Sequence, residues 1–248
     1  MDGRAGSVPI LEVNKATKRF GGLTAVNEVD LSLAEGGILG LIGPNGAGKT
    51  TFFNVLSGVY KADNGCVKFC GEDITRLSPP VRCTKGIGRT FQVPKPFGTL
   101  NVLENVMIGA LLHTNSTTVA REEANNILDI VDLRSKSSFV ANNLTIADRK
   151  RLELAKALAT KPKLLLLDEV MAGLRPSEID DIIVLLEKIN STGITLLIIE
   201  HVMSAIMRLC KYIVVMSNGL KIAEGSPADI AKDEKVIQVY LGEEYKIA

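Results

Sequence analysis

A glycine-rich run of eight residues has the composition and spacing of a loop that holds phosphate groups. It reads Gly43-Pro44-Asn45-Gly46-Ala47-Gly48-Lys49-Thr50 and fits the pattern G-x-x-x-x-G-K-[ST]. An apolar run at 38–42, typical of a buried strand, precedes it, and a predicted helix follows from Thr50. Glycines let main-chain N–H groups approach phosphate oxygens, and the helix N-terminus adds a favourable dipole. Lys49 would then reach the β- and γ-phosphates of a nucleotide, and Thr50 would ligate Mg²⁺.

Two acidic residues follow a second, fully apolar run. Residues 164–167 are four leucines, and Asp168 and Glu169 come directly after them. Ligands of open α/β sheets bind at the carboxyl ends of the strands. Asp168 would hold Mg²⁺ through water, and Glu169 would polarise the water that attacks the γ-phosphate. Two acids after a strand are by themselves more typical of a solvated strand end, but together with the loop at Gly43 they predict nucleotide hydrolysis.

Two isolated polar residues are weaker candidates for the same chemistry. His201 ends the next predicted strand, so its ring could reach the γ-phosphate, although a lone histidine is more often structural. Gln92 precedes Pro94 and Pro96 in an extended segment. It is either plain surface or a mobile ligand of Mg²⁺ or water at one end of a moving helical insert.

The elements that must position these residues alternate between strands and helices. Helices are predicted from 50 to 56, from 202 to 209, and from a start capped by Ser177 with Asp180 to an end at Gly193. Three more, the first capped by Asn101 with Glu104, fill a helical insert at 99–160. Because buried strands alternate with helices, we expect a mostly parallel sheet covered on both sides. The strands are predicted at residues 11–13, 29–33, 38–42, 65–69, 164–167, 195–199 and 212–216.

Charge and hydropathy exclude several classes of protein. A formal net charge of +1 over 248 residues gives no basic face for a nucleic-acid partner. No stretch approaches the roughly 20 apolar residues of a membrane helix, and residues 1–10 lack the features of a signal peptide. The chain is therefore expected in the cytosol, touching a membrane only through partners.

Two other groups of residues are expected to be ordinary structure. The densest basic run, Arg149-Lys150-Arg151, is predicted to be a solvated first turn of a helix. The four cysteines lack the spacing of a zinc site, so they are interpreted as small hydrophobes in a reducing compartment. These cysteines are Cys66, Cys70, Cys83 and Cys210.

The four polar signals, in this order, resemble the ABC ATPase family over essentially the whole chain. The resemblance implies a P-loop NTPase (RecA-like) α/β core at 1–98 and 161–248 with an N-terminal antiparallel β part, and a helical subdomain at 99–160. It implies that the loop at Gly43 is the Walker A motif, that 164–169 is Walker B with the catalytic glutamate, and that residues 172–175 form the D-loop. Gln92 is then the Q-loop residue, His201 the switch histidine, and Phe20 the aromatic that stacks on adenine. The implied contacts to ATP are Phe20, Val26, Gly43, Asn45, Gly46, Ala47, Gly48, Lys49, Thr50, Thr51 and Thr145, and the implied Mg²⁺ ligands are Thr50, Gln92 and Asp168.

Within that family, the chain is similar to the ATPase subunits of branched-chain amino-acid uptake systems. The similarity rests on residues 20–26, 89–92, 167–169, 172–174 and 239–242. It implies transmembrane permease subunits, a second ATPase subunit, an extracytoplasmic solute-binding protein acting indirectly, and a place at the cytoplasmic face of the membrane. An ATPase for another small solute and a non-transport ABC ATPase are the alternatives, but the stretch between Thr50 and Leu144 lacks the sustained heptads of the coiled-coil types. Intact Lys49, Asp168, Glu169 and His201 argue against an inactive scaffold subunit.

One segment departs from the family pattern. The signature, usually Leu-Ser-Gly-Gly-Gln, is here Leu144-Thr145-Ile146-Ala147-Asp148 and contains neither glycine. Thr145 and Asp148 have the spacing of a capping box, so the segment is expected to cap its own helix. From this departure we expect the second ATPase subunit to be a different homologous chain with an intact signature, the other possibility being a second copy of this chain.

Overall fold

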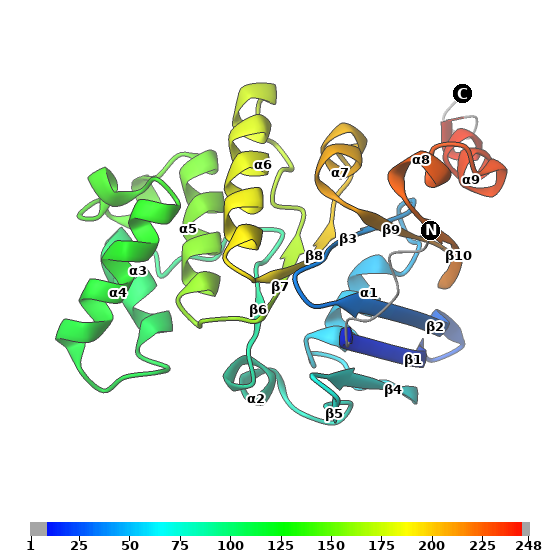
Figure 1. Cartoon of the computed structure of the whole chain (residues 1–248), viewed down its shortest axis with the longest axis horizontal. Coiled ribbons are helices and arrows are strands. Elements are labelled where there is room, and N and C mark those ends of the chain that lie inside the picture. Colours follow the sequence, from blue (N-terminus) through cyan, green and yellow to red (C-terminus); the bar gives the residue numbers. More distant parts are fainter. Residues whose placement is uncertain (1–8, 245–248) are drawn as a thin grey trace. The chain divides into compact units, whose positions relative to one another are not determined.

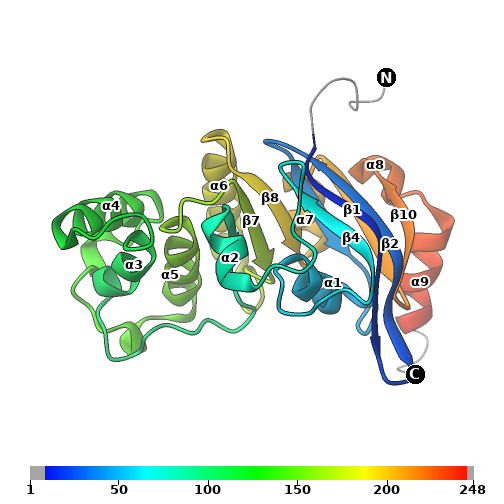
Figure 2. The same ribbon diagram turned by 90° about the horizontal axis from the view of Figure 1, so that it is seen from below.

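The computed structural model describes residues 9–244 and divides into two compact units (Figures 1 and 2). The first unit contains the residues up to Arg82 and those from Thr195 onward, and the second runs from Cys83 to Ile194. The predicted helical insert, 99–160, falls inside the second unit. Residues 1–10, which lack the features of a signal peptide, lie almost entirely outside the described residues.

The first unit begins with an antiparallel sheet in the order β2-β1-β4-β5. Val29, Leu31 and Leu33 of β2 are buried while the residues between them are exposed, so the predicted strand at 29–33 has one buried face and one exposed face. Its four strands are β1 (Pro9–Phe20), β2 (Leu23–Ala34), β4 (Asn64–Phe69) and β5 (Glu72–Asp73).

The first unit has a second set of strands, and the glycine-rich loop at 43–50 follows its central strand, β3 (Ile38–Ile42). Here β3 pairs in parallel with both β8 (Thr195–Ile199) and β9 (Tyr212–Ser217), and all residues of β3 and β8 are buried. The last strand, β10 (Leu220–Gly225), is antiparallel to β9. The helices of this unit are α1 (Lys49–Leu56), α7 (Met203–Leu209), α8 (Pro227–Ile230) and α9 (Glu234–Glu244). A short helix, α2 (Pro79–Thr84), spans the point where the chain passes into the second unit.

The second unit is mainly helical and has two parallel strands, β6 (Ile87–Arg89) and β7 (Leu164–Asp168). Figure 1 shows α3 (Val102–Ala110), α4 (Thr117–Ile130) and α5 (Ile146–Leu158) beside one another, as the predicted helical insert requires. The predicted capping box of α3 is confirmed, because Asn101 and Glu104 exchange hydrogen bonds of 2.8 and 2.9 Å. The remaining elements are α6 (Pro176–Ser191) and the 3₁₀ turns η1 (Arg134–Lys136) and η2 (Ala141–Asn143).

The predicted start of α6 is wrong. Pro176 is the first helical residue, and Arg175 precedes it as the cap, with its main-chain N–H donating to Glu178 at 2.9 Å. Proline suits this first position because its missing N–H has no helical partner there. The Ser177 and Asp180 pattern therefore lies inside the helix, not at its start. Among the described residues, no helix has the length and apolar character to cross a membrane.

A buried arginine closes the end of α1. Arg82 is 1% exposed, and its guanidinium donates to five main-chain carbonyl oxygens at 2.6–3.1 Å. Val55 and Leu56 belong to the last turn of α1, where carbonyl groups lack helical partners. The other three acceptors, Ile74, Thr75 and Leu77, lie in the segment after β5. The side chain of Arg82 therefore joins that segment to α1, the helix that follows the glycine-rich loop. Burial lowers the pKa of Arg82 to about 10.

We predict that Arg82→Met lowers the free energy of unfolding by about 3 kcal/mol or more, because buried carbonyl groups are left without donors. The measurement is a urea unfolding curve. Arg76→Met is the matched control, since Arg76 is exposed in the same segment and its loss should change stability by less than about 0.5 kcal/mol. Equal destabilisation by both variants would contradict the role given to Arg82.

Candidate functional site

The loop at 43–50 holds its lysine against its own main chain. Lys49 is 5% exposed, and its Nζ donates to the carbonyl oxygens of Gly43 at 2.5 Å and Pro44 at 2.8 Å. Asn45, Gly46 and Thr50 are exposed, and Thr51 is half-buried in the first turn of α1. The loop thus presents main chain and a positive charge at a helix N-terminus, which is an arrangement suited to an anion.

Two glycines of the loop are required by their surroundings. Gly43 and Gly48 have φ values of 149° and 97°, and a Cβ on either would collide with a main-chain carbonyl, that of Met216 or Ala25 respectively. The turn between β9 and β10 supports the loop from the other side. Gly219 donates its N–H to Ala47 O at 2.9 Å, and its carbonyl accepts from Asn27 N at 2.8 Å. The loop is therefore fixed by β2 and by the β9–β10 turn.

The other residues of the first unit that are predicted to contact the nucleotide differ in how exposed their side chains are. Phe20, at the end of β1, is 43% exposed, and its ring meets the edge of Tyr60 at a centroid distance of 5.2 Å. His201, two residues after the end of β8, is also exposed. Val26 has no exposed surface, so its side chain packs in the core and has no face for a ligand.

At the end of β7, the first predicted acid is buried beside an arginine. Asp168 is 3% exposed, and Arg89 at the end of β6 donates to its Oδ2 at 3.2 Å. Thr90 accepts a hydrogen bond from Asp168 N at 3.2 Å, which joins the ends of the two strands. Burial raises the pKa of Asp168, and the positive charge of Arg89 opposes that rise. A cation near this carboxylate would favour its ionised form.

The second acid is bonded to the predicted mobile glutamine. Gln92 Nε2 donates to Glu169 Oε2 at 2.5 Å. Glu169 has a left-handed backbone with φ of 49°, a conformation that a residue with a side chain adopts at a cost of about 1–3 kcal/mol. The second unit therefore brings together Gln92, Asp168 and Glu169, while Phe20, the loop and His201 belong to the first unit.

The predicted solvated turn at Arg149-Lys150-Arg151 is wrong for Lys150. This lysine is 4% exposed, and its Nζ donates to Glu169 O at 2.6 Å and to Gln92 O at 3.1 Å. Spacing along α5 is the signal that would have placed it correctly. Leu154 and Ala157, four and seven residues further on, are buried on the same side of the helix.

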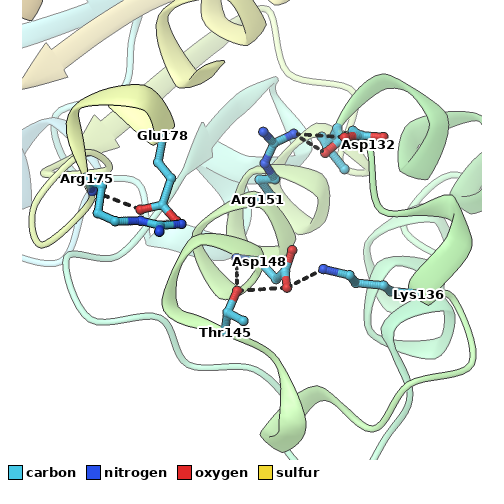
Figure 3. Close-up of polar contacts among 8 residues, drawn as sticks. Asp132, Lys136, Thr145, Asp148, Arg151, Arg175 and Glu178 are labelled. Atoms are coloured by element: carbon cyan, nitrogen blue, oxygen red, sulfur yellow. Dashed lines mark hydrogen bonds and ion pairs between the residues drawn. The ribbon is translucent and has the colours of Figure 1, made fainter. Parts of the chain in front are cut away.

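The atypical signature segment caps α5 with its own side chains (Figure 3). Thr145 Oγ1 accepts from Asp148 N at 3.2 Å and lies 2.8 Å from Asp148 Oδ2. The predicted first bond of a capping box is present, but the carboxylate turns to the hydroxyl instead of the Thr145 N–H. Lys136 forms an ion pair with the same oxygen at 2.6 Å. A carboxylate of this chain thus occupies the start of the helix, close to the hydroxyl that an anion would need.

Comparisons with known proteins agree with the fold and with these motifs. The sequence profile of the family described as "ABC transporter" matches residues 26–172, and that of "Branched-chain amino acid ATP-binding cassette transporter" matches 221–246. A crystal structure of a nucleotide-free ATP-binding cassette from an ABC transporter superposes with a TM-score of 0.86 at 34% identity, covering 94% of this chain and 99% of that one. The ADP conformation of MJ1267, an ATP-binding cassette of an ABC transporter, gives a TM-score of 0.87 at 34% identity, covering 95% of this chain and 100% of that one. The chain is therefore an ABC ATPase, a cassette that binds and hydrolyses ATP to energise transport, and the predicted fold class is confirmed.

Two curated relatives define the family more closely. The high-affinity branched-chain amino acid transport ATP-binding protein BraF of Pseudomonas aeruginosa is 39% identical over 96% of this chain and 99% of its own length. LivG of Escherichia coli, which has the same description, is 38% identical over the same shares of the two chains. The chain belongs to this family of branched-chain amino acid transport ATP-binding proteins, as its sequence motifs indicated.

We predict that Phe20→Ala weakens the binding of ATP and GTP alike, by about 1–3 kcal/mol, because stacking on an aromatic ring tolerates any base. Equilibrium binding of fluorescent analogues of both nucleotides measures the effect. Leu23→Ala is the control, because Leu23 is exposed directly opposite Phe20 on β2. Unchanged affinity for both nucleotides would assign Phe20 to its contact with Tyr60 alone.

Proposed function

We propose that this chain powers the uptake of branched-chain amino acids across the cytoplasmic membrane, as a peripheral subunit bound to transmembrane permease subunits at the cytoplasmic face. A solute-binding protein outside that membrane would deliver the solute to the permease. The observation that carries the proposal is full-length similarity to BraF and LivG in a chain whose Lys49, Asp168 and Glu169 are all intact. Reconstitution with the permease and binding protein in vesicles tests it, since ATP-dependent accumulation of labelled leucine is expected and its absence would contradict the proposal.

Each proposed role matches the local chemistry of its residue. Lys49 carries its charge at a helix N-terminus and binds the β- and γ-phosphates, and Phe20 stacks on adenine. Glu169 polarises the attacking water, Gln92 orients it through the bond to that carboxylate, and His201 contacts the γ-phosphate. Asn45, Gly46, Ala47, Gly48 and Thr51 complete the phosphate contacts through the loop and the start of α1.

The oxygen donors of Thr50, Gln92 and Asp168 suit Mg²⁺, which prefers hard oxygen ligands. A hydroxyl, an amide oxygen and a carboxylate are the types of group that bind this ion alongside substrate phosphates. The raised pKa of Asp168 indicates a carboxylate that a nearby cation would stabilise in its charged form. Bound Mg²⁺ would neutralise phosphate charge during hydrolysis.

The second ATPase subunit is proposed to be a different homologous chain with an intact signature. In this chain, Asp148 accepts from Thr145 and pairs with Lys136 at the start of α5 (Figure 3). A carboxylate at the positive end of a helix competes with phosphate for the same dipole. In addition, Ile146 is 62% exposed at a position where the family has glycine. The complete ATP site would therefore combine Lys49 and Glu169 of this chain with the signature of the other subunit.

We predict that Glu169→Gln lowers ATP turnover of the assembled transporter by about 10²–10⁴-fold, because the amide no longer polarises water as a base. ATP is expected to remain bound, with the dimer held closed, as equilibrium binding and size-exclusion chromatography would show. Glu187→Gln removes an exposed charge on α6 and is the control. Turnover within a few-fold of the parent would refute the role of Glu169.

We also predict that the two ATP sites of the dimer contribute unequally to turnover. Glu169→Gln in this chain alone is expected to abolish most turnover, and the matching change in the other ATPase subunit alone is expected to reduce it less. Single-turnover counting of ATP hydrolysed per dimer distinguishes unequal sites from two coupled equal ones. A fully active homodimer of this chain would rule out the asymmetric arrangement.

A further inference from the structure

The buried ammonium of Lys150 contacts the main chain of two proposed catalytic residues at once. It donates to Glu169 O at 2.6 Å and to Gln92 O at 3.1 Å, and the side chains of these two residues are also bonded to each other. Each catalytic residue is thus held both through its side chain and through its carbonyl group. Because Lys150 is 4% exposed, water does not compete freely for these bonds.

The two carbonyl groups belong to segments that need external support. Glu169 has a left-handed backbone immediately after β7, a conformation that persists only where its surroundings hold it. Gln92 lies after β6 in a stretch without helix or strand, where residues 91–93 are all exposed. A charged donor shared by both carbonyls fixes the distance between the segments and the direction in which both side chains leave the main chain.

The lysine comes from the helix that begins at the atypical signature. Lys150 lies in the second turn of α5, and Thr145 is the cap of the same helix. We infer that Lys150 is a positioning residue. It holds Glu169 and Gln92 in the arrangement that hydrolysis requires, and it links them to the helix that starts at the signature segment. A movement of α5 then reaches both catalytic side chains through one ammonium group. This inference rests on the roles proposed above for Glu169 and Gln92.

Lys156 provides a stringent control on the same helix. It is also a partly buried lysine that donates to a main-chain carbonyl, that of Lys95, at 2.8 Å, and it pairs with Glu153. Its acceptor, Lys95, lies three residues after Gln92, so Lys156 supports the same segment through a different carbonyl group. Comparing Lys150→Met with Lys156→Met therefore separates the loss of these two contacts from the general loss of a lysine on α5.

The first test measures turnover and ATP affinity in the assembled transporter. Lys150→Met is expected to lower kcat by about 10- to 100-fold, as loss of a supporting residue commonly does, with the Kd for ATP unchanged. Lys150→Arg should recover part of the activity because it restores a charged donor, whereas Lys156→Met should leave kcat near that of the parent. A parallel rise in Kd, or equal losses of kcat for the two methionine variants, would overturn the inference. If Lys150→Met does not fold, Lys150→Gln provides a shorter, uncharged side chain that lacks the ammonium group, and parental kcat in that variant would equally overturn the inference.

The second test does not depend on transport. In the isolated chain, hydrogen–deuterium exchange should become faster in peptides containing Gln92 and Glu169 in Lys150→Met, and remain parental there in Lys156→Met. Exchange that is unchanged in Lys150→Met would show that the lysine does not hold these segments. Failure of amino-acid uptake with this exchange result intact would count against the proposed function and leave the positioning role standing.

Discussion

Main-chain carbonyl oxygens accept hydrogen bonds from three buried cations within residues 9–244, and the proposed nucleotide chemistry depends on this form of bonding. Lys49 is bonded to Gly43 and Pro44, Lys150 to Gln92 and Glu169, and Arg82 to the end of α1 and the segment after β5. A carbonyl dipole satisfies a donor without neutralising its charge. The bonds of Lys49 hold its ammonium group within the loop at the start of α1, and the charge of Lys150 helps to keep Asp168 ionised against the effect of burial. Arg82 uses the same bonding to secure the helix that follows the loop.

Much of this arrangement could be predicted from the sequence because strong local patterns specify it. The loop pattern and the four leucines before Asp168 place the main catalytic groups at strand ends, and the helical insert follows from apolar spacing. The weaker elements were missed for identifiable reasons. Strand β10 is partly exposed and lacks alternation, although Asn218-Gly219 is a strong hairpin signal. Arg89 and Lys150 were overlooked because their partners lie far away in sequence, and a charged residue is usually solvated.

The start of α5 shows how the residues of a helix cap can change what the end of the helix recognises. A glycine-rich signature leaves N–H groups accessible, whereas Thr145 and Asp148 use this helix start for internal hydrogen bonds. Lys136 then compensates the added carboxylate, so the local charge is balanced before any ligand arrives. Stability of the helix and affinity for an external anion are thus alternatives at this position. Sequence spacing identified the cap, but the contribution of Lys136 from η1 depended on the fold.

The left-handed backbone of Glu169 has a consequence for how such a chain loses activity over evolutionary time. Glycine or asparagine would adopt this conformation more readily, so selection for folding alone favours replacing the glutamate by a residue that cannot act as a base. Relief of the backbone strain therefore favours loss of the base, although the same replacement also removes the side-chain partner of Gln92. The presence of glutamate at this strained position is therefore explained by its role in hydrolysis and not by the stability of the fold.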